Sequence, residues 1–129
     1  MTREVVTKFF EIQAGKRTGK IEDLFADKVD WDLPGNESKF PWVGKRHMKQ
    51  EVAAFFADFH RHIEPVSFEV EFCAFEGEHA VAVGYLTSKI LKYDKLFSTA
   101  FTATFKVQEG KIVKYHFLED SYKLNEMMN

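Results

Sequence analysis

The sequence predicts an α+β fold in which helices come first and long antiparallel strands follow. Apolar residues recur at helical spacing in the first half of the chain, and from residue 68 onward they alternate with polar residues at strand spacing. Two glycine-containing turns, at 76–79 and 109–110, separate the later strands and indicate hairpins. We therefore expect a curved antiparallel sheet with the helices packed on one face, in the order α-α-β-α-β-β-β-β.

The first half of the chain is predicted to hold three helices and one strand. Helical spacing of apolar residues indicates a helix over 5–12, a short helix near 21–25 and a long helix over 48–63 that Pro65 ends. Residues 28–33 alternate between polar and apolar side chains and form the predicted strand. The stretch "GNESKFPWVGKR" that follows Pro-Gly is expected to be a loop.

The second half is predicted to be a meander of strands. Strands are expected over 68–74, 80–91, 97–107 and 112–119, and a short helix over 122–128 closes the chain. No internal repeat or linker interrupts this pattern, so residues 1–129 are expected to form one domain.

The Glu109-Gly110 turn sets an expected register for the last hairpin. If these two residues form the turn, Ala103 lies opposite His116 and Thr99 lies opposite Asp120. The bulky apolar side chains of the earlier strand should face the core, so this register turns His116 and Asp120 inward. A β-bulge or a three-residue turn would exchange the two faces, and this alternative stays open.

In the same register, the opposite face carries residues that suit a partner subunit. They are Thr102, Thr104, Val113, Tyr115 and Phe117. Exposed aromatic side chains on the outer face of a sheet are usually buried against another protein surface, so we expect a homodimer through this face. Glu119 shares the outer parity and is therefore left out of the predicted site.

Composition narrows the classes of protein. The net charge is −2 and no basic stripe is present, so a nucleic-acid partner is not expected. No apolar run approaches the roughly 20 residues of a membrane span, which favours a cytoplasmic protein without membrane contact. Cys73 is the only cysteine, and no set of His, Asp and Glu residues has the spacing of metal ligands. We expect neither a metal nor another cofactor.

Three segments resemble the SnoaL-like, ketosteroid isomerase-related branch of the nuclear transport factor 2-like superfamily. They are "VDWDLPG", "FPWVGKRHMKQEVAAFF" and "VQEGKIVKYHFLED", and the similarity covers essentially the whole chain. The resemblance implies a cone-shaped, strongly curved sheet wrapped around helices, a deep pocket at its open end and a dimer through the sheet. Because such folds host isomerases, cyclases, dehydratases and binding proteins, the function has to be inferred from the site.

The resemblance also identifies which site residues of the family this chain keeps. The base, the tyrosine and the protonated aspartate of the steroid isomerases fall on Leu33, Phe9 and Ala103, so that mechanism is not expected. The polyketide-cyclase-like members use an acid at the end of the last strand, which Asp120 matches. Positions that hold an arginine and a tyrosine in such proteins hold His116 and Leu118 here.

These considerations lead to a predicted site in a pocket for a small apolar molecule. Asp120 is the candidate acid or base, His116 its polar partner and Tyr85 a hydrogen-bond donor. Six residues are expected to line the pocket: Trp31, Trp42, Phe55, Phe59, Tyr85 and Phe101. Trp42 stands in a loop between Pro41 and Gly44, which favours a place at the rim or in a lid.

Each of the polar candidates also has a structural alternative. Asp120 can cap the last helix, and His116 can be a core histidine with its hydrogen bonds satisfied. The sequence therefore predicts either a cofactor-independent isomerase, cyclase or dehydratase, or a ligand-binding or dimerisation module without chemistry.

Overall fold

The computed structural model describes residues 1–128. Its helices are α1 (Thr2–Gln13), α2 (Lys49–Phe59) and α3 (Ser121–Met127), and a short 3-10 helix, η1, spans Ile21–Leu24. Its strands are β1 (Phe25–Leu33), β2 (Gly44–Met48), β3 (Ile63–Glu76), β4 (His79–Ile90), β5 (Lys95–Gln108) and β6 (Lys111–Glu119).

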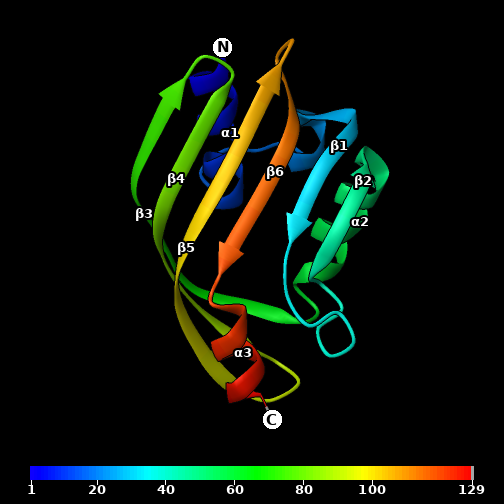
Figure 1. Cartoon of the computed structure of the whole chain (residues 1–129), viewed down its shortest axis with the longest axis vertical. Helices are drawn as coiled ribbons and strands as arrows, with labels where there is room; N and C mark the ends of the chain where they lie inside the picture. Colours follow the sequence, from blue (N-terminus) through cyan, green and yellow to red (C-terminus); the bar gives the residue numbers. More distant parts are fainter. Residues whose placement is uncertain (129) are drawn as a thin grey trace.

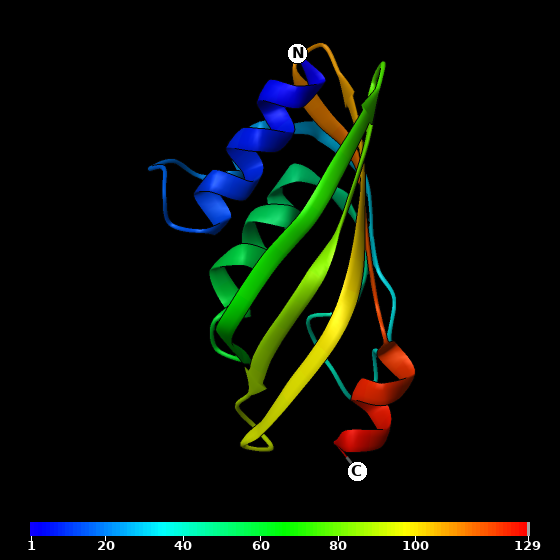
Figure 2. The ribbon, with the colours of Figure 1, turned by 90° about the vertical axis from the view of Figure 1, so that its left-hand side faces the viewer.

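The six strands form one sheet in the order β2-β1-β6-β5-β4-β3 (Figure 1). Neighbouring strands are antiparallel except β1 and β6, which run parallel. Helices α1 and α2 lie on the same face of the sheet, which we call the inner face, and the opposite face is the outer face (Figure 2). The predicted α+β arrangement of helices and a mostly antiparallel sheet is confirmed.

Helix α1 packs against the inner face through aromatic side chains. Phe9 is completely buried, and the centre of its ring lies 5.2 Å from those of both Phe105 and Tyr115. Val5 and Val6 are buried on the same side of the helix, as the helical spacing predicts. Burial of each such side chain contributes about 1.5–3 kcal/mol.

Helix α2 is shorter than predicted, because Ile63 belongs to β3 and not to the helix. The helix ends at Phe59, and the backbone N–H groups of Arg61 and His62 bond in a turn to the carbonyls of Asp58 and Phe59. Ile63 then pairs with Ile90 of β4 and is buried. Strand β3 therefore begins five residues earlier than expected and contains Pro65, which an edge strand tolerates.

Strand β2 occupies part of the segment predicted to be a loop. Its sequence, GKRHM, does not alternate between apolar and polar residues, and most of its side chains are at least partly exposed. Pairing with β1 forms it, with Arg46 opposite Trp31 and Gly44 opposite Leu33. The predicted order of elements thus lacked one strand.

The register predicted for the last hairpin is wrong by one residue. Glu109 and Gly110 form the turn, with φ angles of 52° and 77°, and Val107 faces Ile112 as expected. A β-bulge then shifts the pairing, so that Lys106 lies opposite Lys114. Side chains beyond the bulge therefore exchange faces relative to the prediction, which keeps the charge of Lys114 out of the core.

The bulge reassigns the residues predicted for a partner face. Tyr115 pairs with Phe105 and Phe117 pairs with Ala103, so both aromatic side chains lie on the inner face and are buried. Thr102 and Thr104 do lie on the outer face and are half-buried. Among the described residues, no helix is long and apolar enough to cross a membrane.

Candidate functional site

A cavity of about 750 Å³ lies on the inner side of the sheet. Residues from α1, η1, α2, five strands of the sheet, the Trp42 loop and α3 contribute to its walls. Its volume lies within the range of pockets that bind small organic molecules. Four of the six predicted pocket residues line it: Trp31, Trp42, Phe55 and Phe59.

A row of parallel aromatic rings forms part of the sheet beside the cavity. The ring of Phe101 lies between those of Phe68, at 4.7 Å, and Phe117, at 5.1 Å, with interplanar angles of 21° and 17°. Phe68 and Phe117 line the cavity, whereas Phe101 supports them from between. Gly84 of β4 permits this packing, since a side chain there would meet the Phe101 ring at 2.9 Å.

Tyr85, the remaining predicted pocket residue, lies elsewhere. It pairs with Ala100 and Glu69 on the outer face, where 56% of its surface is exposed. Ala82 and Gly84 are buried on the inner face. Neighbouring residues of a strand point to opposite faces, so Tyr85, which follows Gly84, points outward. The prediction that Tyr85 lines the pocket is wrong.

His116 also lies outside the cavity. The bulge in β6 places it on the outer face, where its Nε2 atom lies 2.9 Å from Oδ1 of Asp30 in β1. This hydrogen bond lowers the pKa of the Asp30 carboxyl group below its usual value. The predicted inward orientation of His116 is wrong, and the ring forms a hydrogen bond with Asp30 on the outer face.

Asp120 takes the structural alternative and caps α3. Its Oδ1 atom accepts a hydrogen bond of 2.9 Å from the backbone N–H of Lys123, which is the usual geometry of an N-cap. Its own backbone N–H donates to the hydroxyl of Thr99 at 3.1 Å. Asp120 is exposed and does not line the cavity, so the structure does not bring it together with His116.

Glu119, and not Asp120, lines the cavity, and Glu22 of η1 is the other carboxylic acid in its wall. Glu119 pairs with Phe101 on the inner face of β6, and it makes no hydrogen bond or ion pair with any residue in 1–128. Burial raises the pKa of its carboxyl group to about 7, because the charged form loses hydration. Near neutral pH the group can therefore either give or take a proton.

The sequence contained one signal for Glu119. The predicted register turned Lys114 inward together with His116, and a buried ammonium group without a partner is costly. A bulge removes this conflict and exchanges Asp120 for Glu119 as the acid on the inner face.

Tyr115 and Trp31 bring further polar groups to the same region. They are paired residues on β6 and β1, and their ring centres lie 4.7 Å apart. The indole Nε1 atom of Trp31 is buried and has no hydrogen-bond partner among the described residues. Burial, with a smaller effect of Glu119, raises the pKa of the Tyr115 hydroxyl far above its usual value, so this group keeps its proton.

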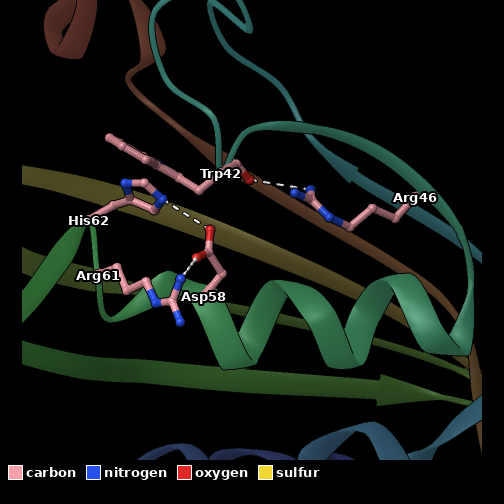
Figure 3. A network of polar contacts seen from close by, with 5 residues as sticks. All are labelled: Trp42, Arg46, Asp58, Arg61 and His62. Atoms are coloured by element: carbon pink, nitrogen blue, oxygen red, sulfur yellow. Dashed lines mark hydrogen bonds and ion pairs between the residues drawn. The ribbon is translucent and has the colours of Figure 1, made fainter.

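A polar network holds Trp42 in the cavity wall (Figure 3). Its ring lies 5.6 Å from that of His62, and Nε2 of His62 lies 3.0 Å from Oδ2 of Asp58. Arg61 forms an ion pair of 3.5 Å with the same carboxylate, and Arg46 donates to the Trp42 carbonyl at 3.3 Å. Trp42 is buried and also lines a second, smaller hollow beside α2.

Within residues 1–128, no three His, Cys, Asp or Glu side chains gather as they would around a metal ion.

Sequence comparison gives the family. Residues 6–115 match the SnoaL-like domain, so the chain belongs to the SnoaL-like domain family. This agrees with the resemblance in the three sequence segments. No curated protein sequence matches the chain significantly.

Structural comparison gives the fold. An NTF2-like protein from Burkholderia xenovorans LB400 superposes with a TM-score of 0.84 at 20% identity, over 99% of this chain and 95% of that one. A protein from Pseudomonas putida KT2440, provisionally named a polyketide cyclase, gives 0.80 at 15% identity, over 100% and 98%. TerC, co-crystallised with polyporic acid, gives 0.73 at 14% identity, over 98% and 97%. These likenesses show that the chain has the NTF2-like fold.

Proposed function

We propose that the chain binds a small, mostly apolar organic molecule in the cavity and that Glu119 transfers a proton to or from it. One observation carries this proposal: an acid without a partner in residues 1–128 lines an aromatic cavity and has a pKa near 7. A carboxyl group in such surroundings is suited to general acid–base catalysis at neutral pH.

The reaction class that fits is isomerisation, cyclisation or dehydration, in which a proton moves between carbon and oxygen atoms of one substrate. Glu119 is able to supply the proton transfer, and the apolar walls exclude water from the reacting atoms. Structural neighbours point the same way, since one is provisionally named a polyketide cyclase and another was crystallised with polyporic acid.

The test measures proton transfer from carbon with a simple ketone. The α-protons of 2-tetralone exchange slowly in deuterated buffer, and proton NMR follows their loss. We expect the wild-type protein to accelerate this exchange and the Glu119→Gln variant to lose roughly 100-fold or more of the acceleration.

Asp120→Asn is the matched control, because it removes the neighbouring carboxylate. Asparagine caps helices as well as aspartate does, so this variant should fold and should keep the activity. A catalytic role for Asp120, predicted from the resemblance, would show the opposite result, with activity lost in Asp120→Asn and kept in Glu119→Gln. Thermal unfolding of both variants separates loss of chemistry from loss of fold.

The alternative function, a ligand-binding module without chemistry, gives a different outcome. Saturable binding of the neutral dye N-phenyl-1-naphthylamine, without any acceleration of exchange, would favour it and would contradict the catalytic part of the proposal.

We further propose that the outer face of the sheet binds a second copy of the chain. Exposed apolar side chains support this, with Phe72, Tyr85 and Leu118 each more than half exposed. All three alternate with inward-facing neighbours and therefore project from the outer face.

A further inference from the structure

We propose that the hydroxyl group of Tyr115 donates a hydrogen bond to the ligand, so that the cavity prefers apolar molecules with a carbonyl oxygen. This inference rests on the proposed function, since it names the class of ligand that the same cavity takes. Tyr115 then acts as a ligand-binding residue, distinct from Glu119.

The first argument is that the Tyr115 hydroxyl has no protein partner, although its side chain is nearly buried. Only 5% of the residue is exposed, and the hydroxyl makes no hydrogen bond with any residue in 1–128. Trp31 Nε1 is the one fully enclosed side-chain polar atom without a partner in that range, so the Tyr115 hydroxyl keeps some accessible surface. Tyr115 lines the cavity, so the cavity is the space from which a ligand can approach this side chain.

The second argument is that the hydroxyl is held in place, so that only a molecule that enters the cavity can accept its hydrogen bond. The Tyr115 ring is packed among those of Phe9 at 5.2 Å, Phe105 at 5.1 Å and Trp31 at 4.7 Å. Such packing fixes the position of the oxygen, and a preorganised donor loses little entropy when a ligand binds. Burial raises the pKa of this hydroxyl far above its usual value, so the group keeps its proton at neutral pH and remains a donor.

The third argument concerns the distance to Glu119. Both residues lie on the inner face of β6 with Phe117 between them, and their Cα atoms are separated by roughly 13 Å of strand. A ligand can contact both groups only if it extends along the strand over the Phe117 ring. The acceptor oxygen is therefore expected at one end of an elongated apolar ligand, with the Glu119 carboxyl group near the other.

The test compares two probes of matched shape. 2-Acetylnaphthalene carries a carbonyl group where 2-ethylnaphthalene carries a methylene group, and quenching of tryptophan fluorescence measures the binding of each. We expect Tyr115→Phe to weaken binding of the ketone roughly fivefold and to leave binding of the hydrocarbon unchanged. Tyr122→Phe is the control, since Tyr122 is 75% exposed on α3 and does not line the cavity.

Infrared difference spectra give a readout that a purely structural role of Tyr115 would not change. A hydrogen bond lowers the stretching frequency of the bound ketone, so the band should lie lower in the wild type and in Tyr122→Phe than in Tyr115→Phe. Equal weakening of both probes by Tyr115→Phe, or an unchanged carbonyl band, would overturn the inference.

The outcomes also separate this inference from the proposed function. If Glu119→Gln abolishes proton exchange while Tyr115→Phe leaves both the affinities and the band unchanged, the proposed function stands and the role of Tyr115 is wrong. If neither probe binds the wild-type protein, both proposals fail.

Discussion

Two polar side chains on the inner face of β6, Glu119 and Tyr115, line the cavity, and Tyr115 is buried while Glu119 is half-buried. Neither has a hydrogen-bond partner among the described residues, and the Tyr115 ring packs against those of Trp31 and Phe117. A buried polar group without a partner destabilises a protein by about 1–3 kcal/mol. Such groups persist where a ligand satisfies them, which is why we place the site here.

The raised pKa of Glu119 predicts how stability changes with pH. The folded protein, with a pKa of about 7 against an ordinary 4.5, binds more protons than the unfolded chain between these values. The protonated form of Glu119 therefore stabilises the folded state relative to the charged form. This contribution is complete below about pH 4 and is lost as the pH rises through 7.

Glu119→Gln removes this titration and makes the effect measurable. From pH 5 to pH 8, we expect the free energy of unfolding of the wild type to fall relative to the variant by on the order of 2 kcal/mol. Urea unfolding at several pH values measures the difference. A wild-type minus variant difference that is constant with pH would show that the carboxyl group is not desolvated.

At the scale of elements, β4 packs closely against β3 and β5 because Gly84 has no side chain. A Cβ atom there would collide with the backbone carbonyl oxygen of Glu69 in β3 and with the Phe101 ring of β5. The close approach of β3, and the row of rings beside the cavity, therefore depend on glycine at this position.

Substitution of Gly84 tests this dependence. We expect Gly84→Ala to lower the free energy of unfolding by roughly 3 kcal/mol through overpacking. The matched change Gly77→Ala, in the turn between β3 and β4, meets no atom within 4 Å, but its φ of 57° makes a cost of roughly 1 kcal/mol. Equal losses in the two variants would contradict the packing argument.

At the scale of the whole molecule, the proposed dimer places an interface on the outer face and leaves the cavity to each subunit. Leu118→Glu puts a charge at the middle of that face, opposite Thr102. We expect light scattering to give a dimer for the wild type and a monomer for Leu118→Glu, with unchanged circular dichroism.

Leu91→Glu is the control for that experiment, because Leu91 is also exposed but lies in the turn between β4 and β5. This variant should remain a dimer. A monomeric wild type at all concentrations would show that the outer face has no second copy as its partner.

Much of the fold follows from periodicity within short segments. Val5, Val6 and Phe9 mark α1, and the alternation along β4 and β5 marks two central strands, because each pattern needs only the local geometry of a helix or strand. The turn at Glu109-Gly110 was predicted for the same reason. The aromatic lining from Trp31, Trp42, Phe55 and Phe59 also followed from residue type and position.

Contacts between distant segments set the limits of two other elements. The polar strand β2 forms only by pairing with β1, and its own residues carry no apolar pattern. Ile63 fits a helical stripe and a strand equally well, and its pairing with Ile90, 27 positions away by sequence number, decides between them.

The sequence alone thus determined the fold class, the family resemblance and an aromatic pocket, whereas tertiary structure decided which polar groups enter that pocket. One extra residue in β6 turns Tyr115 and Glu119 to the inner face, where His116 and Asp120 were expected. Whether a strand bulges depends on its cross-strand partners, on keeping Lys114 out of the core and on burying two aromatic rings. These energies arise between segments that are distant in sequence, so no local pattern reveals them.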